Sequence, residues 1–166
     1  MVKTRYIITA LFVLIIGIVA AYHLLQGQEK RVRRQFKLLS ELASKHGDED
    51  NLTMARKARG IGALFAENCR IETHIASISA SYTRQEIAGL AARARLPFSR
   101  LSVRFYDLRI QFPEKNSAQV TVTGLASGAL RQGDLVDDTL ELVCTLKKLD
   151  NKWLFTGIQV VEVLEK

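Results

Sequence analysis

Few residues of this chain have the type and spacing that chemistry needs, and His74 is the first of them. It ends a short predicted strand, residues 69–74, and an imidazole there can act as a general base if a carboxylate orients it. Asp107 is the nearest suggestion for that partner. A lone histidine at the end of a strand is, however, more often a structural residue than a base.

Asp107 belongs to a long alternating segment. On an extended strand Phe105, Asp107 and Arg109 share one face, and Tyr106 and Leu108 share the other. A solvated pair of Asp107 with Arg109 is therefore a simpler interpretation than a pair inside a pocket.

Other chemical signatures are missing from the sequence. It contains no nucleophile elbow, no glycine-rich phosphate loop and no His/Cys cluster with metal-ligand spacing, so we predict neither a metal nor a cofactor. The two cysteines, Cys69 and Cys144, lie among apolar residues and are expected to be buried free thiols rather than a disulfide.

A long uncharged run occupies residues 6–28, and it is apolar almost without interruption to Tyr22. A membrane-spanning helix needs roughly 20 such residues, so we expect residues 1–27 to be a transmembrane anchor and residues 28–166 one folded domain. A cleaved signal peptide is the alternative, because Lys3 and Arg5 precede the run and small residues lie near its end.

The side of the membrane is harder to predict. Counting positive charges mildly favours a cytoplasmic domain, whereas the resemblance of the first residues to an export signal favours the opposite. We expect a single-pass protein of a bacterial inner membrane with an extracytoplasmic domain.

The formal charge of +7 is concentrated in the first third of the chain. Lys30, Arg31, Arg33 and Arg34 follow the uncharged run directly and are predicted to contact the membrane surface, although a solvated helix face explains them equally well. The rest of the chain shows no basic stripe with interleaved aromatic residues, so we predict no binding of nucleic acid.

The pattern of apolar residues predicts three helices and then a meander of strands. Helical spacing covers residues 28–46, a second helix begins near Asn51, and the capping box of Thr83 and Glu86 opens a third helix that Pro97 ends. A short strand is expected over 69–74 and four longer strands over 101–112, 118–130, 135–148 and 152–163. The fold class is α+β, with three helices packed on a strongly curved, mainly antiparallel sheet.

Residues 64–72 (LFAENCRIE) and 82–87 (YTRQEI) carry a resemblance. In order and spacing they resemble the segment that marks the nuclear transport factor two-like, cystatin-like superfamily, and the likeness extends from about Glu29 to the C-terminus. The resemblance implies a cone-shaped domain. Because this fold hosts isomerases, dehydratases, cyclases and non-catalytic scaffolds, it leaves function to be argued from the site.

The resemblance also nominates site residues. The position of the base in the ketosteroid-isomerase-like branch is matched by Thr73, whose alcohol cannot serve as that base near neutral pH, and a further donor of that branch would lie near Glu141. Related dehydratases use a histidine at the mouth of the cone, which His74 matches. We therefore take as candidate pocket residues Thr73, His74, Tyr82, Asp107 and Glu141.

The function predicted from the sequence is a membrane-anchored, non-catalytic domain that docks protein partners or forms a homodimer. The alternative is a carrier of a small apolar ligand, or an isomerase- or dehydratase-like enzyme, that uses the cone near His74.

Overall fold

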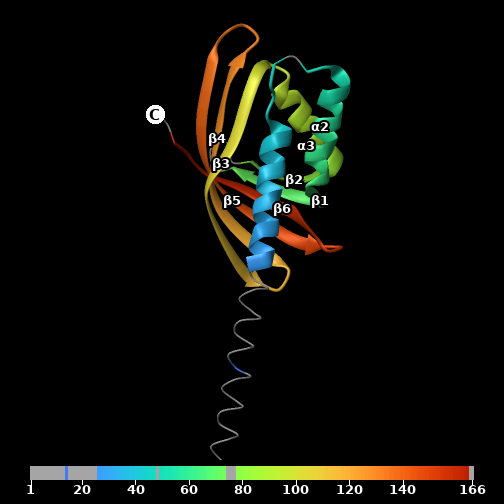
Figure 1. Ribbon diagram of the computed structural model, residues 1–166, viewed down its shortest axis with the longest axis vertical. Helices are drawn as coiled ribbons and strands as arrows, with labels where there is room; N and C mark the ends of the chain where they lie inside the picture. The colour runs from blue at the N-terminus through green and yellow to red at the C-terminus, as the bar shows by residue number, and fades with distance from the viewer. Residues whose placement is uncertain (1–13, 15–25, 48, 74–77, 165–166) are drawn as a thin grey trace, which may run out of the picture.

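A computed structural model of the chain describes residue 14 and residues 26–47, 49–73 and 78–164 (Figure 1). Its regular elements are a first helix at residues 26–43, α2 (Asn51–Ala63) and α3 (Arg84–Arg95), and six strands. The strands are β1 (Phe65–Thr73), β2 (Ile78–Thr83), β3 (Phe98–Glu114), β4 (Ser117–Leu130), β5 (Leu135–Leu149) and β6 (Lys152–Leu164).

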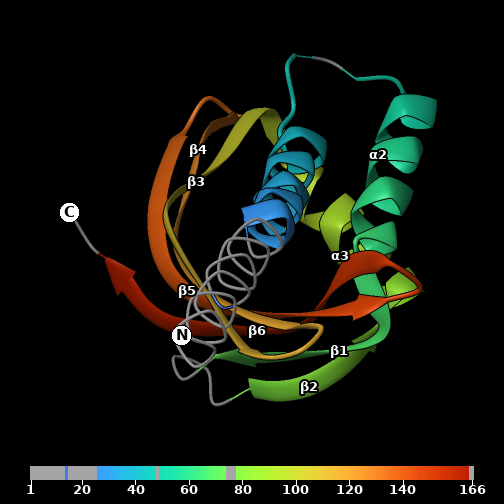
Figure 2. The ribbon, with the colours of Figure 1, turned by 60° about the horizontal axis from the view of Figure 1, so that its bottom comes forward.

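The six strands form one strongly curved sheet in the order β2-β1-β6-β5-β4-β3. All neighbouring pairs are antiparallel except β1 and β6, which run parallel. Figure 2 shows the sheet wrapped around the first helix, with α2 and α3 completing the enclosure on the other side. The predicted class, α+β with three helices on a curved sheet, is confirmed.

No helix in the described part of the chain is long and apolar enough to cross a membrane. The predicted localisation is corrected on this finding: the structure does not support a single-pass membrane protein. The segment predicted as the anchor, residues 1–27, lies almost wholly outside the described residues, so the division of the chain at residue 27 stays a prediction.

Local sequence explains where the helices begin. The Asp50 side chain accepts from the Thr53 backbone N–H and caps α2, which begins at Asn51 as predicted. At α3 the Thr83 hydroxyl accepts from the Glu86 N–H, while the Glu86 carboxylate accepts from the Thr83 N–H, so the predicted capping box is confirmed.

Strand β3 departs from simple alternation. Asp107 has φ of 54°, and the pairing with β4 shifts between Tyr106 and Arg109, which marks a β-bulge. The extra residue reverses the parity of the strand, so that Phe105 and Leu108 both pack against the core while Tyr106 is 42% exposed. The predicted grouping of Leu108 with Tyr106 is therefore wrong.

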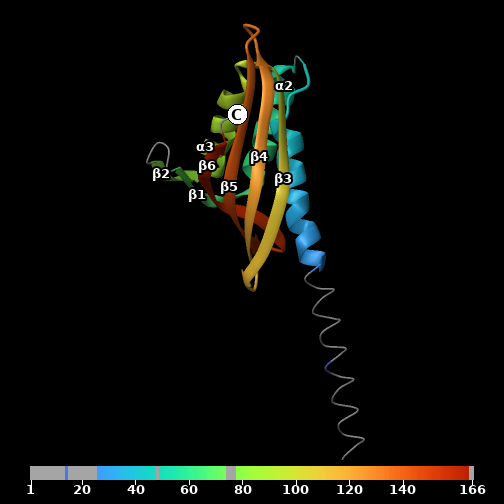
Figure 3. The ribbon, with the colours of Figure 1, turned by 90° about the vertical axis from the view of Figure 1, so that its left-hand side faces the viewer.

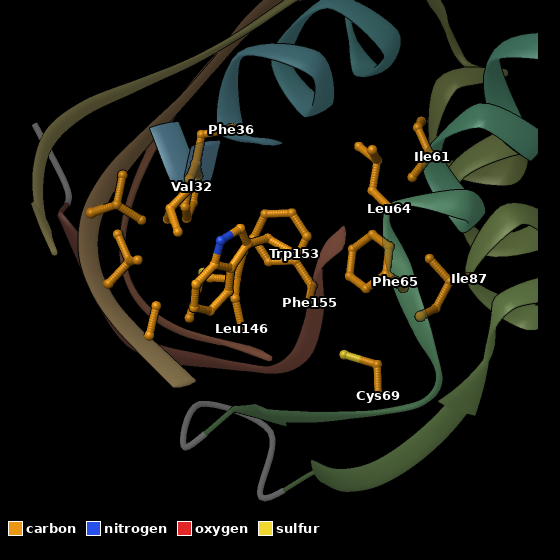
Figure 4. Packing of buried hydrophobic residues seen from close by; sticks show 14 residues of the cluster. Val32, Phe36, Ile61, Leu64, Phe65, Cys69, Ile87, Leu146, Trp153 and Phe155 are labelled. Atoms are coloured by element: carbon orange, nitrogen blue, oxygen red, sulfur yellow. The ribbon is translucent and has the colours of Figure 1, made fainter. Parts of the chain in front are cut away.

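The core fills the space between the first helix and the sheet (Figure 4). Phe36 of the first helix makes edge-to-face contacts with Phe105 and Phe155, whose ring centroids lie 5.5 and 5.1 Å away. Trp153 lies nearer the start of the helix and donates from Nε1 to Gln28 Oε1 at 3.0 Å. These rings fix the helix inside the curve of the sheet.

Candidate functional site

Along the strands, the inward-facing side chains of the concave face change from fully buried to partly exposed. On β5 and β6 the inward residues Cys144, Leu146 and Phe155 are at most 2% exposed. Farther along the same face, Leu142 and Ile158 pack against this core but are only partly buried. Apolar side chains therefore remain accessible at one end of the concave face.

Strand pairing arranges this accessible end in rows. Thr73 of β1 lies opposite Val160 of β6, which lies opposite Leu142 of β5, and Leu142 lies opposite Val122 of β4. A second row, one pleat away, contains Ile71, Ile158, Cys144 and Val120. Within these rows Val120, Val122 and Cys144 are buried in the core. The partly exposed members, Ile71, Leu142, Ile158 and Val160, form an apolar surface that ends at Thr73.

Two predicted site residues lie on this face. Thr73 is two residues beyond Ile71, which packs against the core, and alternation gives both the same orientation. Tyr82 of β2 lies opposite Cys69 of β1 and also packs against the core. His74, the residue after Thr73, lies outside the described residues.

The other two predicted site residues lie elsewhere. Asp107 is exposed at the bulge of β3. Glu141 precedes the inward-facing Leu142 and therefore lies on the convex face, opposite Thr123 and Glu162. The structure thus places Thr73 and Tyr82 on the concave face, four residues apart in the β1–β2 register, and excludes Asp107 and Glu141 from that face.

The basic residues predicted to contact a membrane surface are all exposed on the first helix. Arg33 accounts for most of their contacts, because its guanidinium donates to the Glu29 carboxylate and to the Leu108 carbonyl. Arg31 and Arg34 border an open groove beside Trp153. Nothing in these contacts tests a role at a membrane surface.

Both cysteines are buried free thiols, as predicted. Burial raises the pKa of Cys69 to about 11, and burial together with the neighbouring Cys69 raises the pKa of Cys144 to about 12. Since the thiolate is the reactive form, these groups have little nucleophilic character at neutral pH.

A buried charge cluster joins the ends of the first helix and α3. Lys45 and Arg95 are each 2% exposed. Arg95 donates to the Ala43 and Ser44 carbonyls and to Glu49 Oε2, and Lys57 donates to Glu49 Oε1. Burial raises the pKa of Glu49, but the bonds and charges of Lys57 and Arg95 outweigh it, and the net pKa is lowered.

Sequence reasoning missed this cluster. Helical spacing put Lys45 inside the predicted helix of residues 28–46. The helix instead ends at residue 43, and Lys45 pairs with Leu101 across an isolated bridge (Figure 3 shows the helix lying along β3). No local signal relates Lys45, Glu49 and Arg95, because their contacts are long-range. In the described part of the chain, no group of His, Cys, Asp and Glu could hold a metal ion.

Comparison with known proteins identifies the fold. No protein-family model matches the sequence, and no curated protein is similar to it. Solved structures do match, at sequence identities that show the fold alone.

An NTF2-like protein with a cystatin-like fold from Novosphingobium aromaticivorans is similar with a TM-score of 0.66 and 14% identity, over 86% of each chain. A putative scytalone dehydratase from the same species has a TM-score of 0.64 and 16% identity, over 85% of this chain and 89% of that one. The hexachlorocyclohexane dehydrochlorinase LinA-type3 from Novosphingobium barchaimii has a TM-score of 0.63 and 10% identity, over 84% and 90%. The chain therefore shares the NTF2-like, cystatin-like fold.

Proposed function

We propose that this protein binds a small, mainly apolar molecule against the accessible end of the concave face. The observation that carries the proposal is the row Thr73, Val160 and Leu142, together with the second row through Ile71 and Ile158. Binding sites for small molecules are concave and mostly apolar, with few polar groups that fix orientation. The hydroxyls of Thr73 and Tyr82 fit that role.

Neighbouring residues of β5 provide a matched test, because Leu142 and Val143 face opposite sides of the sheet. The full chain would be titrated with the neutral dye Nile red, whose fluorescence rises in apolar surroundings. We expect Leu142→Phe to fill the site and weaken dye binding about tenfold, roughly 1.4 kcal/mol, and Val143→Phe to leave it within about twofold. Equal effects of the two substitutions, with both variants folded, would refute a concave site.

A catalytic version of this function is an elimination reaction with His74 as base. It is favoured by the sequence, in which His74 directly follows Thr73 of the apolar face, and by the dehydratase and dehydrochlorinase among the proteins that share the fold. In such a reaction the base removes a proton from carbon while water or chloride leaves the neighbouring carbon.

Chloride release from hexachlorocyclohexane, the compound in the name of one structural neighbour, is a first probe of this chemistry. Activity in the full chain that His74→Gln abolishes, while Nile red binding persists, would support the enzyme. Nile red binding without chloride release would support a non-catalytic carrier of an apolar ligand.

The main prediction from the sequence is a membrane-anchored, non-catalytic docking domain. The docking function stays a proposal, and the membrane anchor is not part of it. A homodimer through the convex face would bury outward residues such as Thr121, Thr123, Glu141 and Thr145. Dimer interfaces are more apolar at their centre than this surface is. Light scattering on the full chain tests the proposal, and a monomer at micromolar concentration would reject it.

A further inference from the structure

A second site, separate from the concave face, lies where the first helix ends beside β3. There an open cleft of about 540 Å³ is lined by residues from the 45–47 turn, from β3 and from β4. Its walls are formed by Lys45, His46, Gly47, Arg100, Leu101, Ser102, Arg104 and Ser127. Three of these residues carry a positive charge and none carries a negative one.

The arginines of this cleft are exposed on the outward side of β3. Arg104 is held in place by its bonds to its own strand, donating from Nε to Ser102 Oγ at 3.2 Å and from Nη1 to Tyr106 Oη at 3.4 Å. Among the described residues neither Arg100 nor Arg104 forms an ion pair. A planar guanidinium without a carboxylate partner retains its capacity for bidentate binding of an oxyanion.

Lys45 adds buried positive charge to the wall. Its ammonium group donates to the Phe98 carbonyl at 2.6 Å, and no carboxylate of the described residues pairs with it. The Glu49 carboxylate nearby is already shared between Lys57 and Arg95, and Arg95 Nη1 is buried without a partner among the described residues. A buried cation that lacks a counter-ion raises the local potential and favours an anion in an adjacent cleft.

From this charge distribution we infer that the cleft binds a compact multivalent oxyanion, and that the ligand class is a small phosphorylated molecule. The guanidinium groups of Arg100 and Arg104 would donate hydrogen bonds to the phosphate oxygens, and the hydroxyls of Ser102 and Ser127 would donate further ones. The cleft is of the size that a phosphorylated metabolite needs. This inference does not depend on the apolar ligand of the concave face.

Arg109 provides the matched control, since it lies on the same strand beyond the bulge and outside the cleft. Inorganic pyrophosphate would be titrated into the full chain and its Arg104→Gln, Arg100→Gln and Arg109→Gln variants by calorimetry at low salt. All three substitutions remove one exposed positive charge, so they change the net charge equally. We expect saturable binding that weakens about tenfold in the first two variants and less than about twofold in the third.

Two outcomes would overturn the inference: no saturable binding of pyrophosphate to the unmodified chain, or equal weakening by all three substitutions, which would show general attraction to a basic protein. Melting temperatures of the variants, measured alongside, identify any loss of binding caused by unfolding. Nile red binding should be unchanged in all three, because the concave face is not altered.

Discussion

Arg95 Nη2 donates to Glu49 Oε2 at 2.6 Å, and this bond links the end of α3 to the segment that precedes α2. Both side chains are almost fully buried, with 2% and 8% of their surface exposed. The same guanidinium binds the carbonyls of Ala43 and Ser44, so one side chain holds the end of the first helix, the loop and α3 together.

Glu49→Gln should therefore destabilise the fold by about 3 kcal/mol, because it leaves the buried Arg95 and the partly buried Lys57 without this charge partner. The free energy of unfolding in urea measures this. Glu41→Gln is the control, since the Glu41 carboxylate is 58% exposed and 3.9 Å from Lys37, and it should cost less than about 0.5 kcal/mol. Similar losses in the two variants would contradict a special role for the buried cluster.

Glu49 should also make stability depend on pH. Its pKa in the folded state is lowered from 4.5, so its contribution is fully present above that value and is lost as the pH falls through the folded-state pKa. The urea midpoint of the unmodified chain should drop more between pH 5 and pH 3, approximate limits set by the ordinary range of a glutamate, than that of Glu49→Gln. Parallel pH profiles would show that Glu49 is not coupled to folding.

The bulge at Asp107 gives a backbone prediction. With φ of 54°, the position suits glycine or asparagine and strains a β-branched side chain. Asp107→Val should lower the free energy of unfolding by about 1–2 kcal/mol, whereas Asp107→Gly should be close to neutral. Thermal unfolding distinguishes the two, and a valine variant as stable as the glycine variant would mean that the strand lacks the bulge.

Packing of α2 on α3 depends on Gly62. A Cβ added there would lie 2.6 Å from the Arg84 carbonyl oxygen, whereas a Cβ on Gly89 of α3 meets nothing within 4 Å. Gly62→Ala should destabilise the protein by about 1–3 kcal/mol through overpacking, and Gly89→Ala should stabilise it by about 0.5–1 kcal/mol through helix propensity. If both substitutions stabilised the protein to the same extent, the two helices would not pack this closely.

Local sequence predicted much of this fold. The capping box at Thr83 and the four long strands follow from short-range preferences that the tertiary structure leaves unchanged. Strand β2 is absent from the predicted strands, because its serines and alanine lack the β-branched pattern of a strand and it pairs only with β1.

The site was less predictable than the fold. One bulge residue, Asp107, reversed the parity of β3 and moved a predicted pocket residue to the surface. The orientation of Glu141 depended on a register that alternation alone leaves open. Thr73 and Tyr82 were named from a resemblance, and both lie on the concave face, but their role in a site stays a prediction.

The central claim, an apolar binding surface on the concave face, is tested most directly by methyl NMR of the full chain titrated with a neutral aromatic probe such as p-xylene. The account predicts saturable shifts at the methyl groups of Ile71, Leu142 and Ile158, with those of Val143 on the convex face unchanged. Shifts centred on Val143, or no saturable shift at Ile71, Leu142 and Ile158, would contradict it.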